Sequence, residues 1–395
     1  MSAAVAWRSV PLKALYRRRD ETGRPDLPLL SVYREFGVVP RADREDNFNR
    51  PGEDLSAYRV VHPGDLVVNK MKTWQGSLGV SSLHGIVSPA YFVCRQIGDA
   101  VPRFLHFLLR AQPLVGEYAA RSKGIRPAQW DLPWDAFRDI ALRLPPPDVQ
   151  QTIANFLDAE TVRIDALLDK KRLILIALRQ RQDVEVKARL DADESQWLPI
   201  KRKWEIIDCK HRTPSYIEDG YPVVSPGDAV AGSLDLSRCH RFVDERDFAD
   251  LTQGGRRPLR GDIIYTRNAS VGVASFVDTD EPFCMGQDVC LIRSKDEDQR
   301  FLTYALNTLG LDQLEQEKIG STFTRVNVAR IGDLRVPVPS PERQRSIADH
   351  LDQRQAMYAS LGSTLDRQVA LLQERRQALI TAAVTGQIDV PDIAA

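Results

Sequence analysis

Two short segments in the first third of the chain combine cations, amides and an aromatic ring. Residues 69–75 read Asn-Lys-Met-Lys-Thr-Trp-Gln, and residues 123–129 read Lys-Gly-Ile-Arg-Pro-Ala-Gln. Lysine and arginine bind phosphate or guanine, and amide side chains can form two hydrogen bonds with adenine. The tryptophan could equally stack on a base or fill a core. The pattern predicts contacts with nucleic acid from Asn69, Lys70, Lys72, Trp74, Gln75, Lys123 and Arg126.

Three segments of the second half have similar chemistry. Residues 208–214 read Asp-Cys-Lys-His-Arg-Thr-Pro, residues 266–270 occupy the position of Asn69-Lys70, and residues 320–327 parallel the segment that begins at Lys123. Any polar loop can contain such residues, so recurrence at matching places is the stronger signal. The predicted contact residues here are Lys210, His211, Arg212, Thr213, Arg267, Asn268, Ser321, Thr322 and Arg325.

An internal repeat places these segments. Pro147–Arg181 aligns without a gap with Pro341–Arg375, which lies 194 residues later, and two such periods nearly fill the 395 residues. A repeat of this length predicts two copies of one unit, each a globular block followed by a long helix. A chain with two equivalent halves suits a target with two equivalent halves, and duplex DNA is one.

The globular blocks show matching turns and β-rich runs. Gly64-Asp65 and Gly261-Asp262 each precede an apolar run of strand character, and a proline-rich segment closes each block. The predicted fold class is α+β, with two repeated mixed α/β domains separated by two long antiparallel helices. The predicted boundaries are 1–147 and 196–340 for the two blocks, and 148–195 and 341–395 for the two helical regions.

The two helical regions each carry one apolar seam. Apolar residues recur at spacings of 3, 4 and 7, which is typical of a helix with a single buried face. We expect the seams to pack against each other, whereas the alternative is that each helix packs on its own block. About 25 to 30 residues of helix would span about 40 Å, close to one turn of DNA. The predicted packing residues are Ile153, Leu157, Ile164, Leu167, Leu178, Ile347, Leu351, Leu361, Leu365 and Leu372.

Charge and composition limit the class of protein. The chain has 54 basic and 54 acidic residues, but residues 1–147 carry a net charge of +6 while the three later regions carry −2, −3 and −1. Local clusters, not the total, decide whether a protein can contact DNA. Five cysteines without a CxxC pair indicate reduced thiols in a cytoplasmic protein. The longest apolar run, Leu173–Leu178, is too short to span a membrane, and no signal peptide is recognised.

The motifs of common enzymes are absent from the sequence. There is no phosphate-binding GxxxxGK[ST] loop, no GxGxxG after a strand, no HExxH and no GxSxG. Glu185-Val186-Lys187 resembles part of a nuclease site, but it lies in a helical region where paired charges usually face solvent. Cys209 with His211 offers too few ligands for a tetrahedral metal site. We therefore expect a non-catalytic protein without a metal or cofactor of its own.

Taken together, these motifs identify a family. The run GDLVVNKMKTWQGSLGVSSLHGIVSPAYFV, the DCKHRTP loop, both Q-xxIAxxLD helix starts and the final ERRQALITAAVTGQID resemble the specificity subunits of type I restriction-modification systems. The resemblance covers essentially the whole chain. It implies two target-recognition domains that each read half of a split sequence in double-stranded DNA, with the helices as the spacer between them. It also implies two methyltransferase subunits docked on the helices, and restriction (translocase) subunits. S-adenosylmethionine and ATP with Mg²⁺ would belong to those partners.

Some features depart from the family pattern or fit another class. Val149 and Arg343 stand where the family often has glutamate before the glutamine of the helix start, and Gly362 interrupts the second helix. A coiled-coil adaptor with two protein-binding heads would explain the repeat and the zero net charge, but not the cationic segments at matching places. A fused restriction-methylation enzyme would require the missing catalytic motifs.

Overall fold

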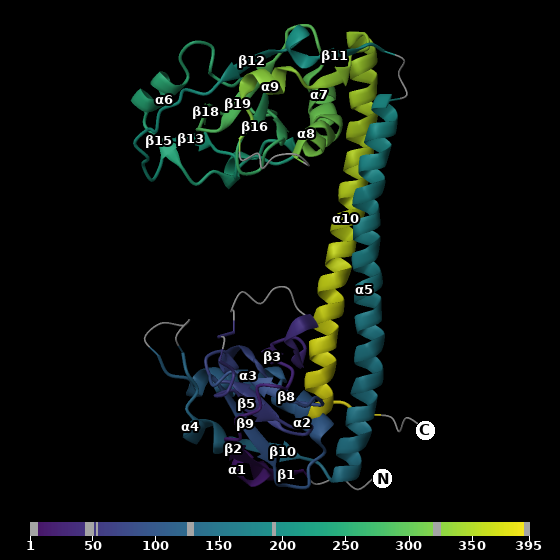
Figure 1. Ribbon diagram of the computed structural model, residues 1–395. Helices are drawn as coiled ribbons and strands as arrows, with labels where there is room; N and C mark the ends of the chain where they lie inside the picture. Colours follow the sequence, from purple (N-terminus) through teal and green to yellow (C-terminus); the bar gives the residue numbers. More distant parts are fainter. Residues whose placement is uncertain are drawn as a thin grey trace. The chain divides into compact units, whose positions relative to one another are not determined.

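The computed structural model describes residues 7–43, 51–52, 54–124, 130–191, 195–318 and 325–390. The chain divides into two compact units, one made of Met1–Arg172 with Asp366–Ala395 and the other of Leu173–Leu365. Each unit holds one mixed α/β head together with a segment of both long helices (Figure 1). We call residues 7–146 the first head and residues 195–340 the second head.

The first head is built on an antiparallel sheet in the order β2-β9-β6-β7. Smaller two-stranded sheets, β1-β10, β3-β4 and β5-β8, lie beside it. Its elements are β1 (Arg8–Pro11), α1 (Leu12–Leu15), β2 (Tyr16–Arg19), β3 (Leu30–Tyr33), β4 (Gly37–Pro40), η1 (Arg41–Asp43), β5 (Arg59–Val61), β6 (Leu66–Asn69), η2 (Thr73–Gln75), β7 (Leu78–Val80), β8 (Gly85–Val87), β9 (Tyr91–Gln96), α2 (Pro102–Leu109), α3 (Gln112–Arg121), α4 (Trp134–Arg138) and β10 (Ala141–Leu144).

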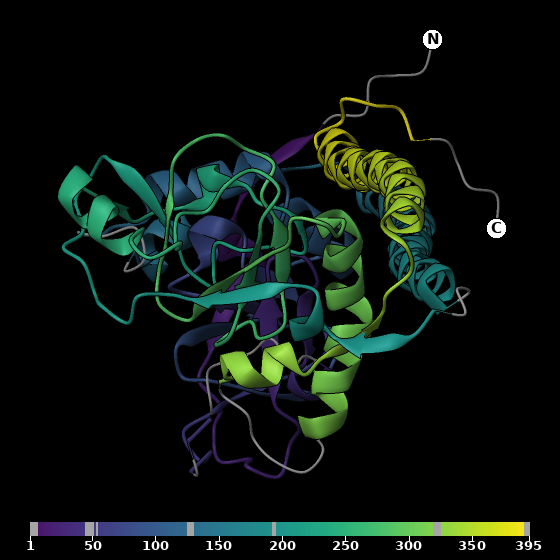
Figure 2. The ribbon, with the colours of Figure 1, turned by 90° about the horizontal axis from the view of Figure 1, so that it is seen from above.

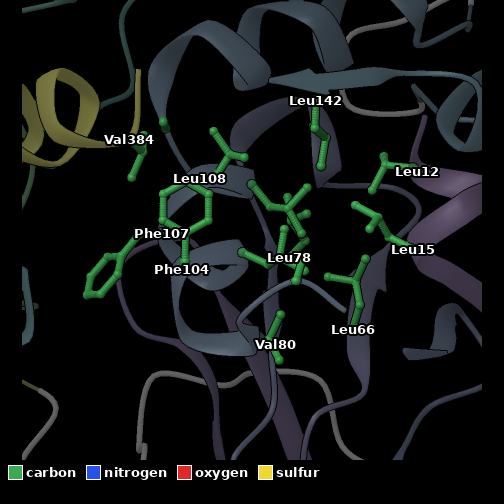
Figure 3. Close-up of a cluster of buried hydrophobic side chains, with 14 of the residues drawn as sticks. Leu12, Leu15, Leu66, Leu78, Val80, Phe104, Phe107, Leu108, Leu142 and Val384 are labelled. Atoms are coloured by element: carbon green, nitrogen blue, oxygen red, sulfur yellow. The ribbon is translucent and has the colours of Figure 1, made fainter. Parts of the chain in front are cut away.

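The central strand β6 is buried on both faces, which explains its continuous apolar run. Leu66 and Val68 point into a core shared with α2, whereas Val67 points to the other face and packs with residues of β3, β4, β5 and β8. Figure 3 shows the first of these clusters, with Leu66 and Phe104 among the labelled side chains. The alternation follows from the two-residue period of a strand.

The second head repeats this topology. Its main sheet has the order β12-β19-β16-β17-β14, so its first four strands match β2-β9-β6-β7, and β11-β20 matches β1-β10. Its elements are β11 (Trp197–Pro199), η4 (Ile200–Arg202), β12 (Glu205–Asp208), β13 (Tyr221–Val224), β14 (Gly232–Ser233), η5 (Leu236–Arg238), β15 (Phe242–Val243), α6 (Glu245–Leu251), β16 (Ile263–Thr266), β17 (Ala274–Phe276), β18 (Cys284–Met285), β19 (Val289–Arg293), α7 (Gln299–Ala305), the π-helix η6 (Leu306–Gly310), α8 (Leu311–Lys318), α9 (Val328–Gly332) and β20 (Arg335–Pro337).

Two long helices complete the fold. Helix α5 (Pro147–Asp191) has 45 residues and α10 (Pro341–Val384) has 44. In the first unit, Arg376 pairs with Asp165 at 2.9 Å and Lys171 donates to Gln368 at 2.6 Å. Going forward along α5 therefore goes backward along α10, so the helices are antiparallel there. The two views in Figures 1 and 2 agree that the helices lie side by side within each unit. The predicted fold class, including the long helices, is confirmed.

The second unit contains an equivalent pairing of α5 with α10. Glu185 of α5 accepts hydrogen bonds from Arg354 at 2.6 Å and from the Tyr358 hydroxyl at 2.7 Å. These bonds lower the pKa of Glu185 to about 2. Lys187 pairs with Asp312 of α8 at 2.6 Å, and Val186 is buried in the core. The three residues that resemble a nuclease motif therefore make structural contacts.

Each head core is completed by the ends of both helices. In the first unit, residues 153–157 of α5 and residues 380–384 of α10 belong to the core of the head. In the second unit, residues 347–351 of α10 and residues 186–190 of α5 do the same. The prediction that Ile153, Leu157, Ile347 and Leu351 pack only between the helices was therefore incomplete, since these residues also fill the head cores.

The middle of the predicted seam is only partly correct. Ile164 is buried, but Leu167 and Leu361 are 41% and 44% exposed, and Leu168 is buried in place of Leu167. Neighbouring helical residues differ in direction by about 100°, so an error of one residue moves a side chain off the buried face. Two packed helices can bury only one stripe each. Leu178, Leu365 and Leu372 are half-buried.

A buried glutamine joins each long helix to its head. Gln150 accepts a hydrogen bond from the Val101 backbone at 2.9 Å and donates to the Pro145 carbonyl at 2.8 Å. Gln344 likewise accepts from the Asp298 backbone at 3.0 Å and donates to the Pro339 carbonyl at 2.9 Å. Both glutamines are fully buried. Their recurrence in the sequence repeat reflects a buried polar group that must be fully hydrogen-bonded.

The structure also describes the cysteines and the hydrophobicity of the helices. All five cysteines are buried and free. None of the described helices is both long enough and apolar enough to cross a bilayer.

A buried histidine in the first head makes stability depend on pH. His106 faces the Val80 carbonyl through Nδ1 at 3.1 Å, while Nε2 lies 2.8 Å from the guanidinium of Arg110 and accepts from it. Burial, and then the neighbouring Arg110, lower the pKa of His106 from 6.5 to about 3. His106 therefore takes up a proton near pH 6.5 in the unfolded chain, whereas in the folded chain it stays neutral until a much lower pH. This contribution to stability is complete above pH 6.5 and declines as the pH falls toward 3.

We expect the free energy of unfolding to fall by about 2 kcal/mol from this group between pH 7 and pH 5. Urea unfolding of the wild type and of His106→Gln at both pH values measures this contribution, because glutamine can form similar hydrogen bonds and does not titrate. An equal pH dependence in the two proteins would show that His106 is not the group responsible.

Candidate nucleic-acid interface

In the first head, the predicted segment 69–75 is a tight turn between β6 and β7. The Asn69 side chain accepts from the Met71 backbone at 3.2 Å, and the Lys72 carbonyl accepts from the backbone of Gln75 at 3.0 Å. Gly76, at φ +89°, closes the turn because only glycine adopts this conformation without strain. Lys72 and Gln75 are exposed at the surface of this turn.

The second predicted segment of the first head lies beside this turn. Lys123 and Asp131 exchange two backbone hydrogen bonds of 2.9 Å, which close the loop between them, and the Leu132 backbone donates to the Lys70 carbonyl at 3.3 Å. Trp74 is half-buried, with its ring edge-on to Trp130 at 5.3 Å between centroids. Trp130 was missed from the sequence, although it directly follows the segment. Arg126 lies outside the described residues.

The cations of this site are available for phosphate. Among the residues that the structure describes, Lys70, Lys72 and Lys123 form no ion pair with a carboxylate. Lys70 instead lies 5.6 Å from the centre of the Phe92 ring. An unpaired lysine on a surface turn can replace the counterions of a DNA backbone.

The second head places Arg267 where the first has Lys70. Arg267 directly follows β16, and its carbonyl accepts from the Val326 backbone at 2.8 Å, as the Lys70 carbonyl does from Leu132. Its side chain is only 5% exposed, however, and its guanidinium is paired with Asp208 and donates to the Val326 carbonyl at 3.1 Å. The sequence did not indicate this burial, in which a carboxylate at the end of β12 holds the guanidinium inward. A contact between Arg267 and DNA stays a prediction.

A cavity opens above this buried arginine. It has a volume of about 380 Å³ and is lined by His211, Arg267, Arg325 and Asn327. Three of the four were predicted as contact residues from separate segments. Asn327 is the N-cap of α9, where its side chain accepts from the Arg330 backbone at 2.7 Å. The predicted residues Ser321 and Thr322 lie outside the described residues.

An aspartate that the sequence did not single out organises this cavity. Asp288 pairs with Arg325 at 3.0 Å, accepts from the Asn268 side chain at 3.2 Å, and its carbonyl accepts from the Arg267 backbone at 2.8 Å. A sequence search for cations and amides passes over it, because its role depends on strands distant in sequence. Gln287, its neighbour, donates to the Thr213 hydroxyl at 2.8 Å.

The remaining cations of the 208–213 loop tie this loop to α6. Lys210 pairs with Asp250, and Arg212 pairs with Asp250 and, at 2.6 Å, with Asp247. Hydrogen bonds from Lys210 and Arg212 lower the pKa of Asp250. The pKa of Asp247 is lowered by the Ser215 backbone and by Arg212. Lys210 and Arg212 are thus compensated by carboxylates, whereas Lys70, Lys72 and Lys123 have no ion-pair partner among the described residues.

One cluster of possible metal ligands occurs in this loop. The ligand atoms of Asp208, Cys209 and His211 lie within 4.8 Å of one another. The two ring nitrogens of His211 face different partners, with Nε2 at 3.1 Å from Asp208 and Nδ1 at 3.8 Å from the Cys209 sulfur. Burial raises the pKa of Cys209, and Asp208 is also engaged by Arg267. Contacts within the protein therefore account for these three side chains, and Asp208 among them holds the buried guanidinium of Arg267.

Comparison with known proteins places this site in a family. Residues 220–368, which include most of the second head, match the family model described as the type I restriction modification DNA specificity domain. Residues 220–368 are therefore similar to this DNA specificity domain, and Arg267, Arg325 and Asp288 all lie within the matched residues. A search of the curated proteins finds no match.

The fold of the whole chain agrees with this assignment. It matches, with a TM-score of 0.74 and 17% identity, a chain from a structural study of complex assembly and conformational transition of the type I R-M system, over 98% of this chain and 100% of that one. It also matches the HsdS subunit from Thermoanaerobacter tengcongensis, with a TM-score of 0.53 and 17% identity, over 98% and 99%. At this identity the likeness shows the fold. The resemblance to specificity subunits is confirmed by the family match and by this fold.

We expect Arg267→Ala to destabilise the second head by about 3 kcal/mol, because it removes the buried guanidinium that pairs with Asp208 and donates to the Val326 carbonyl. The matched control is Arg260→Ala at the other end of β16, where the arginine pairs with Asp278 and Asp280 on the surface. This control should change stability much less than Arg267→Ala, because solvent screens an exposed ion pair. Urea unfolding measures both, and equal stabilities would contradict a structural role for Arg267.

Proposed function

We propose that this chain is the DNA-specificity subunit of a type I restriction-modification complex and that each head reads one half of a bipartite target. The observation that carries the proposal is the recurrence of one contact-site geometry in both heads. In each, the residue after the central strand bonds through its carbonyl to the segment before the last short helix, as Lys70 does with Leu132 and Arg267 with Val326. The match to a DNA specificity domain supports this function for the second head, and the repeated sheet topology extends the proposal to the first.

The two heads present different chemistry at the equivalent place. The first offers a pair of tryptophans and three lysines that form no ion pair with a described carboxylate, whereas the second offers arginines held by carboxylates around a cavity. Contacts to phosphate give affinity without sequence information, and oriented donors give sequence information. Two heads with one fold and unlike surfaces are therefore suited to unlike half-sites.

The long helices would set the unread gap between the half-sites. Residues 158–185 of α5 lie between the segments that enter the two head cores. As one regular helix these 28 residues would span about 42 Å, which is near the value expected from the sequence. One turn of DNA is about 34 Å.

The exposed face of α5 would dock the modification subunits. Leu173, Ile176 and Val184 are 64%, 52% and 65% exposed. Their spacings of three and eight residues place them on one stripe of the helix. Exposed apolar patches of this kind mark interaction surfaces. We propose that two methyltransferase subunits, which bring S-adenosylmethionine, bind here, and that restriction (translocase) subunits bring ATP and Mg²⁺. The chain itself would be non-catalytic and cofactor-free, and would act in the cytoplasm.

Salt dependence tests the contact assignment in the first head. Each phosphate contact contributes about 0.9 to the slope of log affinity against log salt concentration. We expect the double variant Lys72→Ala/Lys123→Ala, in complex with the modification subunits, to reduce this slope by about 2 while the preferred sequence stays the same. Fluorescence anisotropy with labelled target duplex at several salt concentrations provides the measurement.

The control is Lys13→Ala, at the other end of the sheet. Lys13 precedes β2, which starts opposite Gln96 at the end of β9, whereas Asn69 lies opposite Tyr91 at its start. This variant should leave the slope unchanged. If the wild-type slope is flat, the proposed function fails and a protein-binding adaptor is favoured. If the double variant keeps the wild-type slope, the two lysines do not contact phosphate.

Lengthening the helices tests the spacer. We expect four residues inserted after Ala177 in α5, with four inserted after Gly362 in α10, to change the length of the unspecified gap in the DNA that is methylated. Four residues add about one helical turn, or roughly 6 Å, and so preserve the faces that pack. Sequencing of methylated bases in plasmid DNA reports the gap. An unchanged gap in an active complex would contradict the spacer role.

A further inference from the structure

The cavity of the second head combines strong hydrogen-bond donors with a balanced charge. Its lining contains two guanidinium groups, those of Arg267 and Arg325, and each is paired with a carboxylate, Asp208 or Asp288. The other two lining residues, His211 and Asn327, add polar atoms without a fixed charge. The site is thus rich in N–H donors but carries little net charge.

Arg325 is the lining group best placed to meet a ligand. Its side chain is 49% exposed, whereas that of Arg267 is 5% exposed and bonded to Asp208 and to the Val326 carbonyl. The bond to Asp288 engages Nη2 of Arg325, and a guanidinium has five N–H donors in a fixed plane. Asp288 therefore fixes the direction of the guanidinium and leaves donors for another partner.

The backbone around Asp288 holds it in an uncommon conformation. Within the described part of the chain, the non-glycine residues with positive φ are Ala269, at +58°, and Asp288, at +67°. Ala269 adjoins Asn268, whose side chain donates to Asp288. Strained backbone of this kind persists where the surrounding structure enforces it, and it concentrates at functional sites. Asp288 is itself part of the Arg325 pair, and Ala269 follows Asn268, which also forms an isolated β-bridge with Arg325.

We propose that Arg325, oriented by Asp288, reads a guanine in the half-site that the second head recognises. The inference rests on the proposed function and names the base that one residue selects. Guanine presents two acceptors, O6 and N7, on its major-groove edge, and a planar guanidinium bonds to both at once. Adenine presents the N6 amino group, a donor, beside N7, and this donor would face the N–H donors of the guanidinium unfavourably.

The charge balance favours a base over a phosphate. A contact with phosphate gains its affinity from releasing counterions, and that gain requires uncompensated positive charge. Asp288 already compensates Arg325, whereas Lys72 and Lys123 of the first head form no ion pair with any described carboxylate. The neutral edge of a base needs oriented donors instead, which an arginine held by an aspartate supplies.

Selection from a randomised duplex library tests this inference, with the chain in complex with its modification subunits. The wild type should enrich a motif with a guanine at a defined position of one half-site. Arg325→Ala should lose the preference at that position alone, by about 5-fold to 150-fold, and keep the salt slope of the wild type. Arg260→Ala, which removes another carboxylate-paired arginine from the same head, should keep both the motif and the slope.

A modified base separates base reading from any change in folding. Replacing the selected guanine by 7-deazaguanine removes the N7 acceptor and should weaken binding of the wild type about tenfold, while Arg325→Ala should bind both duplexes equally. Asp288→Asn keeps the size of the side chain and suits positive φ, but removes the charge that compensates Arg325. This variant should reduce the guanine preference and make the salt slope steeper. Thermal unfolding confirms that the variants are folded.

Three results would overturn the inference. A reduced salt slope with an unchanged motif in Arg325→Ala would identify a phosphate contact. An unchanged motif and slope would show that Arg325 does not touch the DNA. Equal sensitivity of the wild type and Arg325→Ala to 7-deazaguanine would assign the guanine to another residue. Failure of the proposed function has a different signature, since the wild-type complex would then enrich no motif at all.

Discussion

Burial of the helix ends inside the head cores is the constraint on which the rest of the structure depends. In each unit, the core takes the first turns of one long helix and the last turns of the other. Neither core is complete without residues from both halves of the sequence repeat. Because apolar burial is the dominant favourable term in folding, a head without these helix ends would expose part of its apolar core. The helices are therefore part of each recognition module.

Buried polar groups make this joint specific. A glutamine at the start of each helix, Gln150 or Gln344, bonds to the backbone at the start of a helix of its head. Ion pairs add a second link at equivalent places, from Arg103 to Asp158 and from Arg300 to Asp352. A buried amide without partners would be costly, so these glutamines select one position of the helix on the head.

The sequence predicted the features that repeat, and it failed where the partner lies far away in the chain. The period, the Gly-Asp turns and the long helices could be read directly, and the turns are the same in structure, since Asp65 and Asp262 both accept from a backbone three residues earlier. The burial of Arg267 could not be read, because it depends on Asp208 at the end of another strand. Which of the neighbours Leu167 and Leu168 is buried depends on how the helices pack, and this could not be predicted from spacing alone.

The candidate nucleic-acid interface was also predicted only in part from the sequence. Two contact segments of the first head and three of the second were found by residue type. Backbone bonds at Lys70 and Arg267 connect these segments in the structure. Asp288 and Trp130 were not found, since an acid and an aromatic acquire a role only through their neighbours. Which side chains touch DNA stays a prediction for both heads. The difference between free lysines in one head and paired arginines in the other emerged only from the contacts.

The central claim is that two equivalent heads on one pair of helices read two separate pieces of one duplex. Sequencing of methylated bases in the genome of a cell that expresses this chain with its modification subunits tests it most directly. The account predicts methylation at one motif made of two specified elements with an unspecified gap of constant length. A single uninterrupted motif, or two elements at variable distances, would contradict it.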